Sequence, residues 1–165
     1  MKVKDIMVKD IITIKPDETL EEVALKFAKS NISGAPVVEN NKVIGVISEA
    51  DILEHIRKTC KKFDMVYIPT PLSKLGIVDF REGKSKNLEE AFTKAGKTKA
   101  KEVMKRDLIT TTPNELAKNV AKLMIEKKIN RLPVVKNEKL VGIVTRGDII
   151  KGVTISKELS KENSR

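Results

Sequence analysis

Two short segments of the chain place a glycine, a hydroxyl and a carboxylate at the same spacing. Residues 45–51 read Gly-Val-Ile-Ser-Glu-Ala-Asp, and residues 142–148 read Gly-Ile-Val-Thr-Arg-Gly-Asp. Each segment runs from an apolar strand-like stretch into a polar turn. A carboxylate in the first turn of a helix accepts hydrogen bonds from two adjacent hydroxyls, and the Ser or Thr adds a further donor or acceptor. The pattern is therefore suited to holding a ribose.

The same spacing has a purely structural interpretation. Ser48 with Asp51, and Thr145 with Asp148, also fit a helix capping box, in which the hydroxyl and the carboxylate each satisfy a backbone N–H of the first helical turn. A cap that faces solvent can still contact a ligand, so the two interpretations are compatible and both stay open.

An internal repeat organises the rest of the chain. An offset of 97 residues places Pro16 on Pro113, and without any gap about fifty residues then align with many identities. The identical pairs begin at Lys4, Met7, Asp10, Ile12, Thr13, Glu18, Val23, Ala24, Ile32, Pro36, Val37, Val38, Asn40, Lys42, Gly45, Asp51 and Ile52. We infer two copies of one structural unit.

Each copy predicts the order β-α-β-β-α, which is an α/β (α+β) fold. A short strand over 11–14 is followed by a helix that Asp17 would cap, with apolar residues at helical spacing from Leu20 to Phe27. Strands over 35–39 and 42–47 flank Asn40-Asn41, a pair suited to a tight hairpin turn. A second helix begins near Ser48. Two such repeats, packed as a pseudo-two-fold module, would bury faces that one alone leaves exposed.

These patterns divide the chain into four segments. The first repeat covers 1–57 and the second covers 100–155. Residues 58–99 form an insertion with a short helix over 87–95, which we expect to pack on one of the repeats. The polar stretch 156–165 is predicted to be a flexible tail.

Composition excludes several classes of protein. The single cysteine, Cys60, rules out an intramolecular disulfide, and the single histidine, His55, argues against a histidine-based zinc site. We expect no metal site and no catalytic residue. Residues 1–15 lack the apolar core of a signal peptide, and no apolar run approaches a membrane span, so we expect a cytoplasmic protein without membrane contact.

The net charge of +10 is unevenly distributed. Residues 4–57 hold 7 basic and 10 acidic side chains, for a net of −3, whereas residues 100–152 hold 12 and 6, for a net of +6. A basic surface attracts nucleotides, nucleic acids or acidic proteins, and it is also an ordinary solvated surface.

The repeats and both turns resemble CBS (cystathionine-β-synthase) domains. The resemblance rests on Ile-Ser-Gly-Ala-Pro-Val-Val at 32–38, Ile-Asn-Arg-Leu-Pro-Val-Val at 129–135 and the two Gly-x-x-Ser/Thr-x-x-Asp turns, and it covers residues 3–57 and 100–153. It implies a module of two repeats with two clefts, in which many members bind AMP, ADP, ATP or S-adenosylmethionine. In such members the turn holds the ribose, and a basic residue two positions before the strand proline contacts phosphate.

Carried onto this sequence, the resemblance implies two unequal clefts. The main cleft would use Lys9, Ile11, Ile32, Ser33, Arg131, Ile143, Thr145 and Asp148. The second cleft would use Val46, Ser48, Asp51, Leu108, Ile129 and Asn130. Gly34 occupies in the second cleft the position that Arg131 has in the main one, so only the main cleft offers a phosphate contact.

The sequence therefore predicts a regulatory module that senses an adenosyl compound, requires no cofactor, is not an enzyme and acts on a downstream protein that the sequence does not identify. We also expect a homodimer, because the helices after the two turns carry Ile52, Leu53, Ile56, Ile149 and Ile150. Two alternatives stay open. One is a basic protein associated with nucleic acid, although no recognition motif supports it. The other is a structural dimerisation module with empty clefts.

Overall fold

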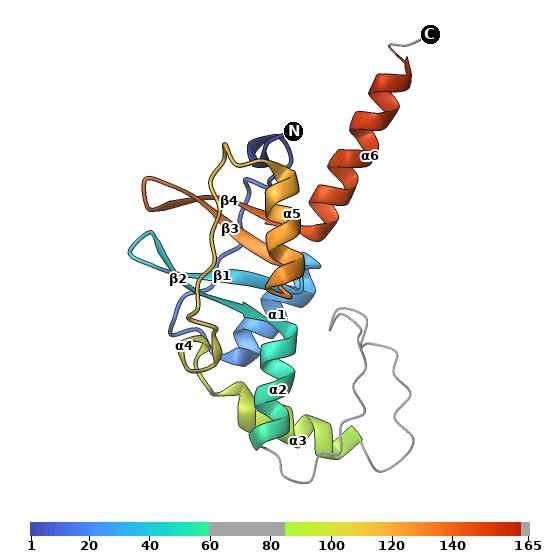
Figure 1. Ribbon diagram of the computed structural model, residues 1–165. Helices are drawn as coiled ribbons and strands as arrows, with labels where there is room; N and C mark the ends of the chain where they lie inside the picture. The colour runs from blue at the N-terminus through green and yellow to red at the C-terminus, as the bar shows by residue number, and fades with distance from the viewer. Residues whose placement is uncertain (60–84, 163–165) are drawn as a thin grey trace. The chain divides into compact units, whose positions relative to one another are not determined.

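A computed structural model describes residues 1–59 and 85–162 of the 165-residue chain. Cys60 and most of the predicted insertion lie outside these residues. The described elements alternate helices with two β-hairpins, so the predicted α/β class is confirmed (Figure 1). In chain order they are η1 (Val3–Asp5), α1 (Leu20–Ser30), β1 (Gly34–Glu39), β2 (Lys42–Ser48), α2 (Glu49–Thr59), α3 (Ser85–Gly96), α4 (Ala100–Val103), α5 (Ala117–Glu126), β3 (Arg131–Lys136), β4 (Lys139–Thr145) and α6 (Arg146–Glu162).

Each hairpin turns through two residues with positive φ. Asn40 and Asn41 have φ values of 49° and 63°, and Asn137 and Glu138 have 51° and 62°. Two successive left-handed residues form the turn whose twist matches that of antiparallel strands, and Asn tolerates this conformation better than most residues. The hairpin predicted at Asn40-Asn41 is therefore confirmed.

Two local predictions were wrong. The strand expected over 11–14 is reduced to one parallel bridge, in which Ile14 exchanges backbone hydrogen bonds with Pro36 and Val38 at 3.0 and 2.9 Å. Helix α1 is capped by Thr19 rather than by Asp17, because the Thr19 hydroxyl accepts the N–H of Glu22 at 3.3 Å. The Glu22 carboxylate in turn accepts the Thr19 N–H at 2.7 Å, which lowers the pKa of Glu22.

The compact units of the structure do not coincide with the two sequence repeats. One unit, here called the first-repeat unit, is Ile12–Leu108; the other, the second-repeat unit, joins Met1–Ile11 to Ile109–Arg165. The first eleven residues, which the sequence repeat assigned to the first copy, therefore pack with the second copy.

The beginning of each repeat joins the core of the other. Val3 is fully buried with Val120 and Leu132 of the second-repeat unit, and its N–H bonds to the carbonyl of Glu115 at 2.9 Å. By the same geometry, the N–H of Ala100 bonds to the carbonyl of Glu18 at 2.8 Å in the first-repeat unit. The two sets of bonds occupy equivalent positions at the repeat offset of 97.

Ion pairs also hold the segment around Ala100 against the loop before α1 in the first-repeat unit. Lys99 and Lys101 lie 3.0 and 2.8 Å from the Asp17 carboxylate. Their hydrogen bonds and positive charge lower the pKa of Asp17 to about 2. Asp17 thus stabilises the loop before α1 rather than the helix itself, although the exposure of all three side chains limits its contribution.

Helix α3 packs on the two longer helices of the first-repeat unit, α1 and α2. Its Ala91 and Ala95 are buried in the same core as Ile52 and Ile56 of α2. It contains the helix predicted over 87–95 and lies beside α2 in Figure 1.

Helix α6 is longer than the sequence suggested. We predicted a flexible tail from 156, but the helix continues through Glu162. Residues 156–162 contain two Lys, two Glu and one Leu, and these residue types have good helix propensity. In the described part of the chain, none of the helices is long and apolar enough to cross a membrane.

Candidate ligand-binding site

The turn between β4 and α6 forms a closed pair of side chains. Oδ2 of Asp148 accepts the Thr145 N–H at 2.8 Å and the Thr145 hydroxyl at 2.7 Å, while the Asp148 N–H donates to the same hydroxyl oxygen at 3.3 Å. This is a reciprocal capping box, so the structural interpretation of the spacing is correct here.

The cap uses a single carboxylate oxygen of Asp148. Both contacts from Thr145 end on Oδ2, so the cap itself does not use Oδ1. The residue as a whole is half-buried rather than enclosed. A carboxylate oxygen accepts two hydrogen bonds, which suits a pair of adjacent ribose hydroxyls.

Arg131 lies directly across the hairpin from Thr145. The two residues are Cα partners in the antiparallel register of β3 and β4, so their side chains leave the sheet on the same face. Ile143, two residues before Thr145, is on this face as well and is half-buried. Leu132 and Val144 alternate to the opposite face and are fully buried. Arg131 and Ile143 therefore lie on the face of the hairpin opposite to the core, on the same side as Thr145, which bonds to the Asp148 carboxylate.

The N-terminal segment extends the β3–β4 sheet beside this face. The Val8 N–H bonds to the Ile143 carbonyl at 2.9 Å, and the Ile143 N–H bonds back to the Val8 carbonyl at 2.9 Å. Lys9 follows directly in the chain. The second-repeat unit therefore contains six of the eight residues predicted for the main cleft, namely Lys9, Ile11, Arg131, Ile143, Thr145 and Asp148.

The glycine of each motif makes room for this added segment. A Cβ on Gly142 would lie 2.6 Å from Sδ of Met7 and 3.2 Å from the carbonyl oxygen of Val8. A Cβ on Gly45 would lie 2.8 Å from the carbonyl oxygen of Lys105. The glycine therefore admits the neighbouring backbone, a role that the spacing alone did not reveal.

The turn of the first repeat has the same two contacts to its carboxylate and an additional partner. Oδ2 of Asp51 accepts the Ser48 N–H at 2.9 Å and the Ser48 hydroxyl at 2.5 Å. Its Oδ1 lies 3.2 Å from Nζ of Lys105. Lys105 is held by reciprocal backbone bonds with Val46, at 3.0 and 2.9 Å, in the position that Val8 has in the other unit.

Sequence reasoning missed Lys105, although a signal was present. The offset of 97 pairs Val8 with Lys105, an apolar residue with a cation, beside turns that are otherwise alike. From this segment the second-cleft prediction included only Leu108, which is the last residue of the first-repeat unit.

The remaining predicted residues lie where a helix start meets the beginning of a hairpin. The Ser33 carbonyl accepts the N–H of Glu49, and the Asn130 carbonyl accepts the N–H of Arg146, each at 3.1 Å. Ile32 and Ser33 belong to the first-repeat unit, and Ile129 and Asn130 belong to the second-repeat unit. Their sharing of a cleft with residues of the other unit stays a prediction.

Comparison with known proteins decides the family. The sequence pattern of the CBS domain matches residues 3–58 and 100–154. The chain belongs to the CBS domain family. The resemblance inferred from the two turns and the Pro-Val-Val strands is confirmed, and the repeats described above are its two CBS domains.

Similar proteins share most of this CBS pair. The protein MJ1426 of Methanocaldococcus jannaschii is 37% identical over 155 residues, which cover 93% of this chain and 91% of that protein. MJ1232 of the same organism is also 37% identical over 152 residues, covering 92% of this chain but only 39% of that protein. The crystal structure of the CBS domain pair of MJ0100 was determined with 5′-methylthioadenosine and S-adenosyl-L-methionine. It has a TM-score of 0.65 and 25% identity, covering 94% of this chain and 98% of that one.

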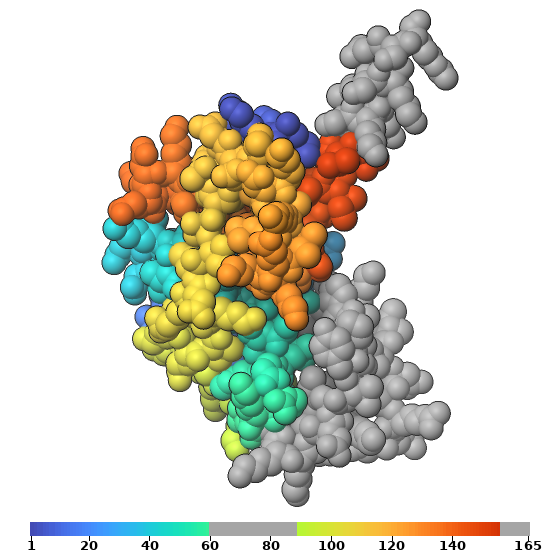
Figure 2. All heavy atoms as spheres, viewed as in Figure 1, coloured from blue at the N-terminus to red at the C-terminus, as the bar shows by residue number. Residues whose placement is uncertain are grey.

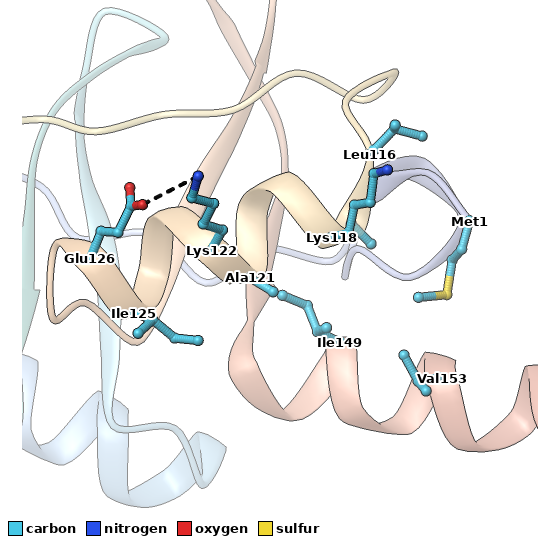
Figure 3. A pocket seen from close by; sticks show the side chains of 10 residues that line it. Met1, Leu116, Lys118, Ala121, Lys122, Ile125, Glu126, Ile149 and Val153 are labelled. Atoms are coloured by element: carbon cyan, nitrogen blue, oxygen red, sulfur yellow. Dashed lines mark ion pairs between the residues drawn. The ribbon is translucent and has the colours of Figure 1, made fainter.

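The second CBS domain also has an apolar groove, which is separate from the capped turn. Its volume is about 810 Å³, and it lies between α5, the start of α6 and the N-terminus (Figure 3). Its lining residues include none of those predicted for either cleft; they are Met1, Leu116, Ala117, Lys118, Ala121, Lys122, Ile125, Glu126, Ile149 and Val153. The groove therefore has few polar groups that could orient a nucleotide.

Proposed function

We propose that the chain is a regulatory, non-catalytic CBS pair that binds an adenosyl compound through the turn of its second CBS domain. One observation carries this proposal. The capping contacts of Asp148 use a single carboxylate oxygen and leave Oδ1 on a half-buried face beside Arg131 and Ile143. We infer that Oδ1 accepts the ribose hydroxyls while Ile143 packs against the base.

Charge supports a phosphorylated or otherwise anionic ligand at this turn. The segment 100–152 has a net charge of +6, and Arg131 lies on the same face as Thr145. A guanidinium binds phosphate oxygens by two parallel hydrogen bonds. The adenosyl compounds bound to the MJ0100 domain pair, to which this chain is similar, support the choice of ligand class. AMP and ATP are the candidates that the charge favours, whereas S-adenosylmethionine, which has no phosphate, is a candidate through the similarity to the MJ0100 pair alone.

The proposal is tested by calorimetric titration of the purified chain with adenosine, AMP and S-adenosylmethionine, with GMP as the control ligand. The informative variant is Asp148→Asn. Its amide oxygen still accepts the Thr145 N–H and keeps the cap, but its NH₂ group replaces the second acceptor oxygen. Loss of a charge-assisted hydrogen bond lowers affinity about ten- to a hundredfold. Unchanged affinity in Asp148→Asn, or no binding of any adenosyl compound, would contradict the proposal.

A second variant separates ribose from phosphate recognition. Arg131→Ala should weaken AMP binding and leave adenosine binding nearly unchanged, because only AMP carries the phosphate. Equal weakening of both ligands would mean that Arg131 shapes the hairpin rather than contacting phosphate. Thermal unfolding of each variant shows whether the domain is still folded.

We further propose that two copies associate through the helices of the second CBS domain. Of the apolar residues predicted on α2, Ile52 and Ile56 are buried in a core that also contains Ala91 and Ala95 of α3, and Leu53 is half-buried. Helix α6, in contrast, leaves Ile150 and Val153 exposed by 67% and 42%. Helix α5, which faces the viewer in Figure 2, leaves Ile125 exposed by 75%. An isologous contact would cover this surface.

Sedimentation of Ile150→Lys tests this association. The variant should be monomeric at concentrations where the wild type is dimeric, because a buried unpaired charge opposes association. Leu25→Lys is the matched control, since Leu25 is an exposed apolar residue of α1 in the other CBS domain. A dimer that survives Ile150→Lys and dissociates in Leu25→Lys would show that the contact lies on the first CBS domain instead.

The cytoplasm remains the compartment that we propose.

A further inference from the structure

The two capped turns differ at one position that the repeat makes directly comparable. In the first-repeat unit Nζ of Lys105 lies 3.2 Å from Oδ1 of Asp51. In the second-repeat unit the equivalent position is Val8, whose apolar side chain brings no cation to the Asp148 carboxylate. The difference concerns the oxygen that a ribose would use.

We propose that Lys105 is a specificity-determining residue. Its ammonium group pairs with Oδ1 of Asp51 and blocks ribose binding at that oxygen, an effect called the plug below. A neutral adenosyl ligand therefore binds preferentially at Asp148. This inference rests on the proposed function, because the plug competes with the ligand considered above. Its basis is the pairing of Lys105 with a carboxylate that is otherwise equivalent to that of Asp148.

The backbone fixes both positions in the same way. Lys105 exchanges two hydrogen bonds with Val46 on β2, and Val8 exchanges two with Ile143 on β4. Each pair forms one antiparallel bridge at the edge of its hairpin. Because the backbone geometry is repeated, the side chain at this position decides whether a cation can reach the carboxylate.

The local surroundings make the plug effective but reversible. The Asp51 side chain is only 10% exposed, and its Oδ2 is already occupied by the Ser48 N–H and hydroxyl. A ribose would therefore need Oδ1, from which it must displace Lys105. The Lys105 side chain is 73% exposed, so solvent screens the pair and the ammonium can move away. An exposed ion pair of this kind corresponds to about a two- to fivefold change in affinity.

Phosphate changes the outcome in a predictable direction. A displaced ammonium group near the turn attracts an anionic ligand, which offsets part of the cost of displacing it. The plug should therefore discriminate against adenosine more strongly than against AMP. Adenosine is the probe that measures the plug alone.

The experiment uses the full chain and amide NMR, so that each turn reports its own dissociation constant. Adenosine is titrated while the amide signals of Ser48 and Thr145 are followed. Lys105→Val, which installs the residue type of the other turn, should tighten binding at Ser48 by about two- to fivefold. Val8→Lys should weaken binding at Thr145 by a similar factor, whereas Val8→Met, of similar length without charge, should not.

The outcomes distinguish the plug from the proposed function. If adenosine shifts Thr145 in the wild type, but neither Lys105→Val nor Val8→Lys changes an affinity, the plug is wrong and the proposed function stands. If Val8→Met weakens binding as much as Val8→Lys, bulk rather than charge is responsible and the plug is wrong. If adenosine shifts neither amide in any of the proteins, both proposals are wrong.

Discussion

Replacing Val3 by Ala should destabilise the second-repeat unit, although Val3 belongs to the first repeat of the sequence. The side chain is fully buried among residues of the second-repeat unit. Removing two methyl groups costs about 0.8 kcal/mol each in transfer free energy, and the cavity left behind adds to this. We therefore expect a loss of about 2–3 kcal/mol in the free energy of opening.

Amide hydrogen exchange resolves which domain is affected. A loss of this size accelerates exchange about thirty- to 150-fold for amides that exchange through opening of that domain. In Val3→Ala the amides of β3 and β4 should accelerate, and those of β1 and β2 should change much less. Val8→Ala is the control, because Val8 lies in the same segment but is 43% exposed.

The mirror variant is Met104→Ala. Met104 belongs to the second repeat of the sequence, but it is buried in the core of the first-repeat unit with Ile47 and Phe27. Its truncation should accelerate exchange in β1 and β2. The interpretation would be refuted if Val3→Ala removed protection from β1 and β2 while β3 and β4 kept theirs.

Two further predictions concern backbone space and pH. Gly45→Ala should destabilise the first CBS domain by about 1–3 kcal/mol in thermal unfolding, because its Cβ would lie 2.8 Å from a backbone oxygen; Gly147→Ala, whose nearest neighbour atom is at 3.6 Å, should be neutral or stabilising. Asp17→Asn should cost a small, salt-sensitive amount of stability at neutral pH. Since pairing with Lys101 lowers the pKa of Asp17 to about 2, this advantage of the wild type is present above about pH 4 and is lost as the pH falls through 2; a difference that grows at low pH would contradict this.

The sequence predicted what local pattern controls. The hairpin at Asn40-Asn41 follows from residues that tolerate positive φ, and α1 follows from its apolar spacing. The capped turns follow from the Ser/Thr-x-x-Asp spacing, which fixes contacts between residues three positions apart. Each of these features depends on interactions within a few residues of the chain.

The exchange of segments between the repeats could not be predicted in this way. Because Met7 and Met104 are identical at the repeat offset, each segment is chemically suited to either copy, and local pattern does not choose between them. The contact between Lys105 and Asp51 was not predicted for a related reason, since it joins residues far apart in the sequence. Such pairings depend on the path of the chain.

The exposure of the apolar residues on α2 and α6 was also predicted incompletely. The sequence suggested surplus apolar surface on both helices that follow the turns. Packing against α3 helps to bury Ile52 and Ile56 of α2, whereas α6 keeps Ile150 exposed. An amphipathic helix can be recognised in a sequence, but the helix on which it packs is set by tertiary structure.

The most direct test of ligand binding through Asp148 compares adenosine with 2′,3′-dideoxyadenosine in the wild type and in Asp148→Asn, by calorimetry. The dideoxy compound lacks both ribose hydroxyls, and the variant lacks the acceptor oxygen proposed to bind them. The wild type should prefer adenosine by about ten- to a hundredfold, and the variant should show almost no preference, because the two changes remove the same interaction. An equal preference for adenosine in both proteins would show that the ribose hydroxyls are recognised elsewhere.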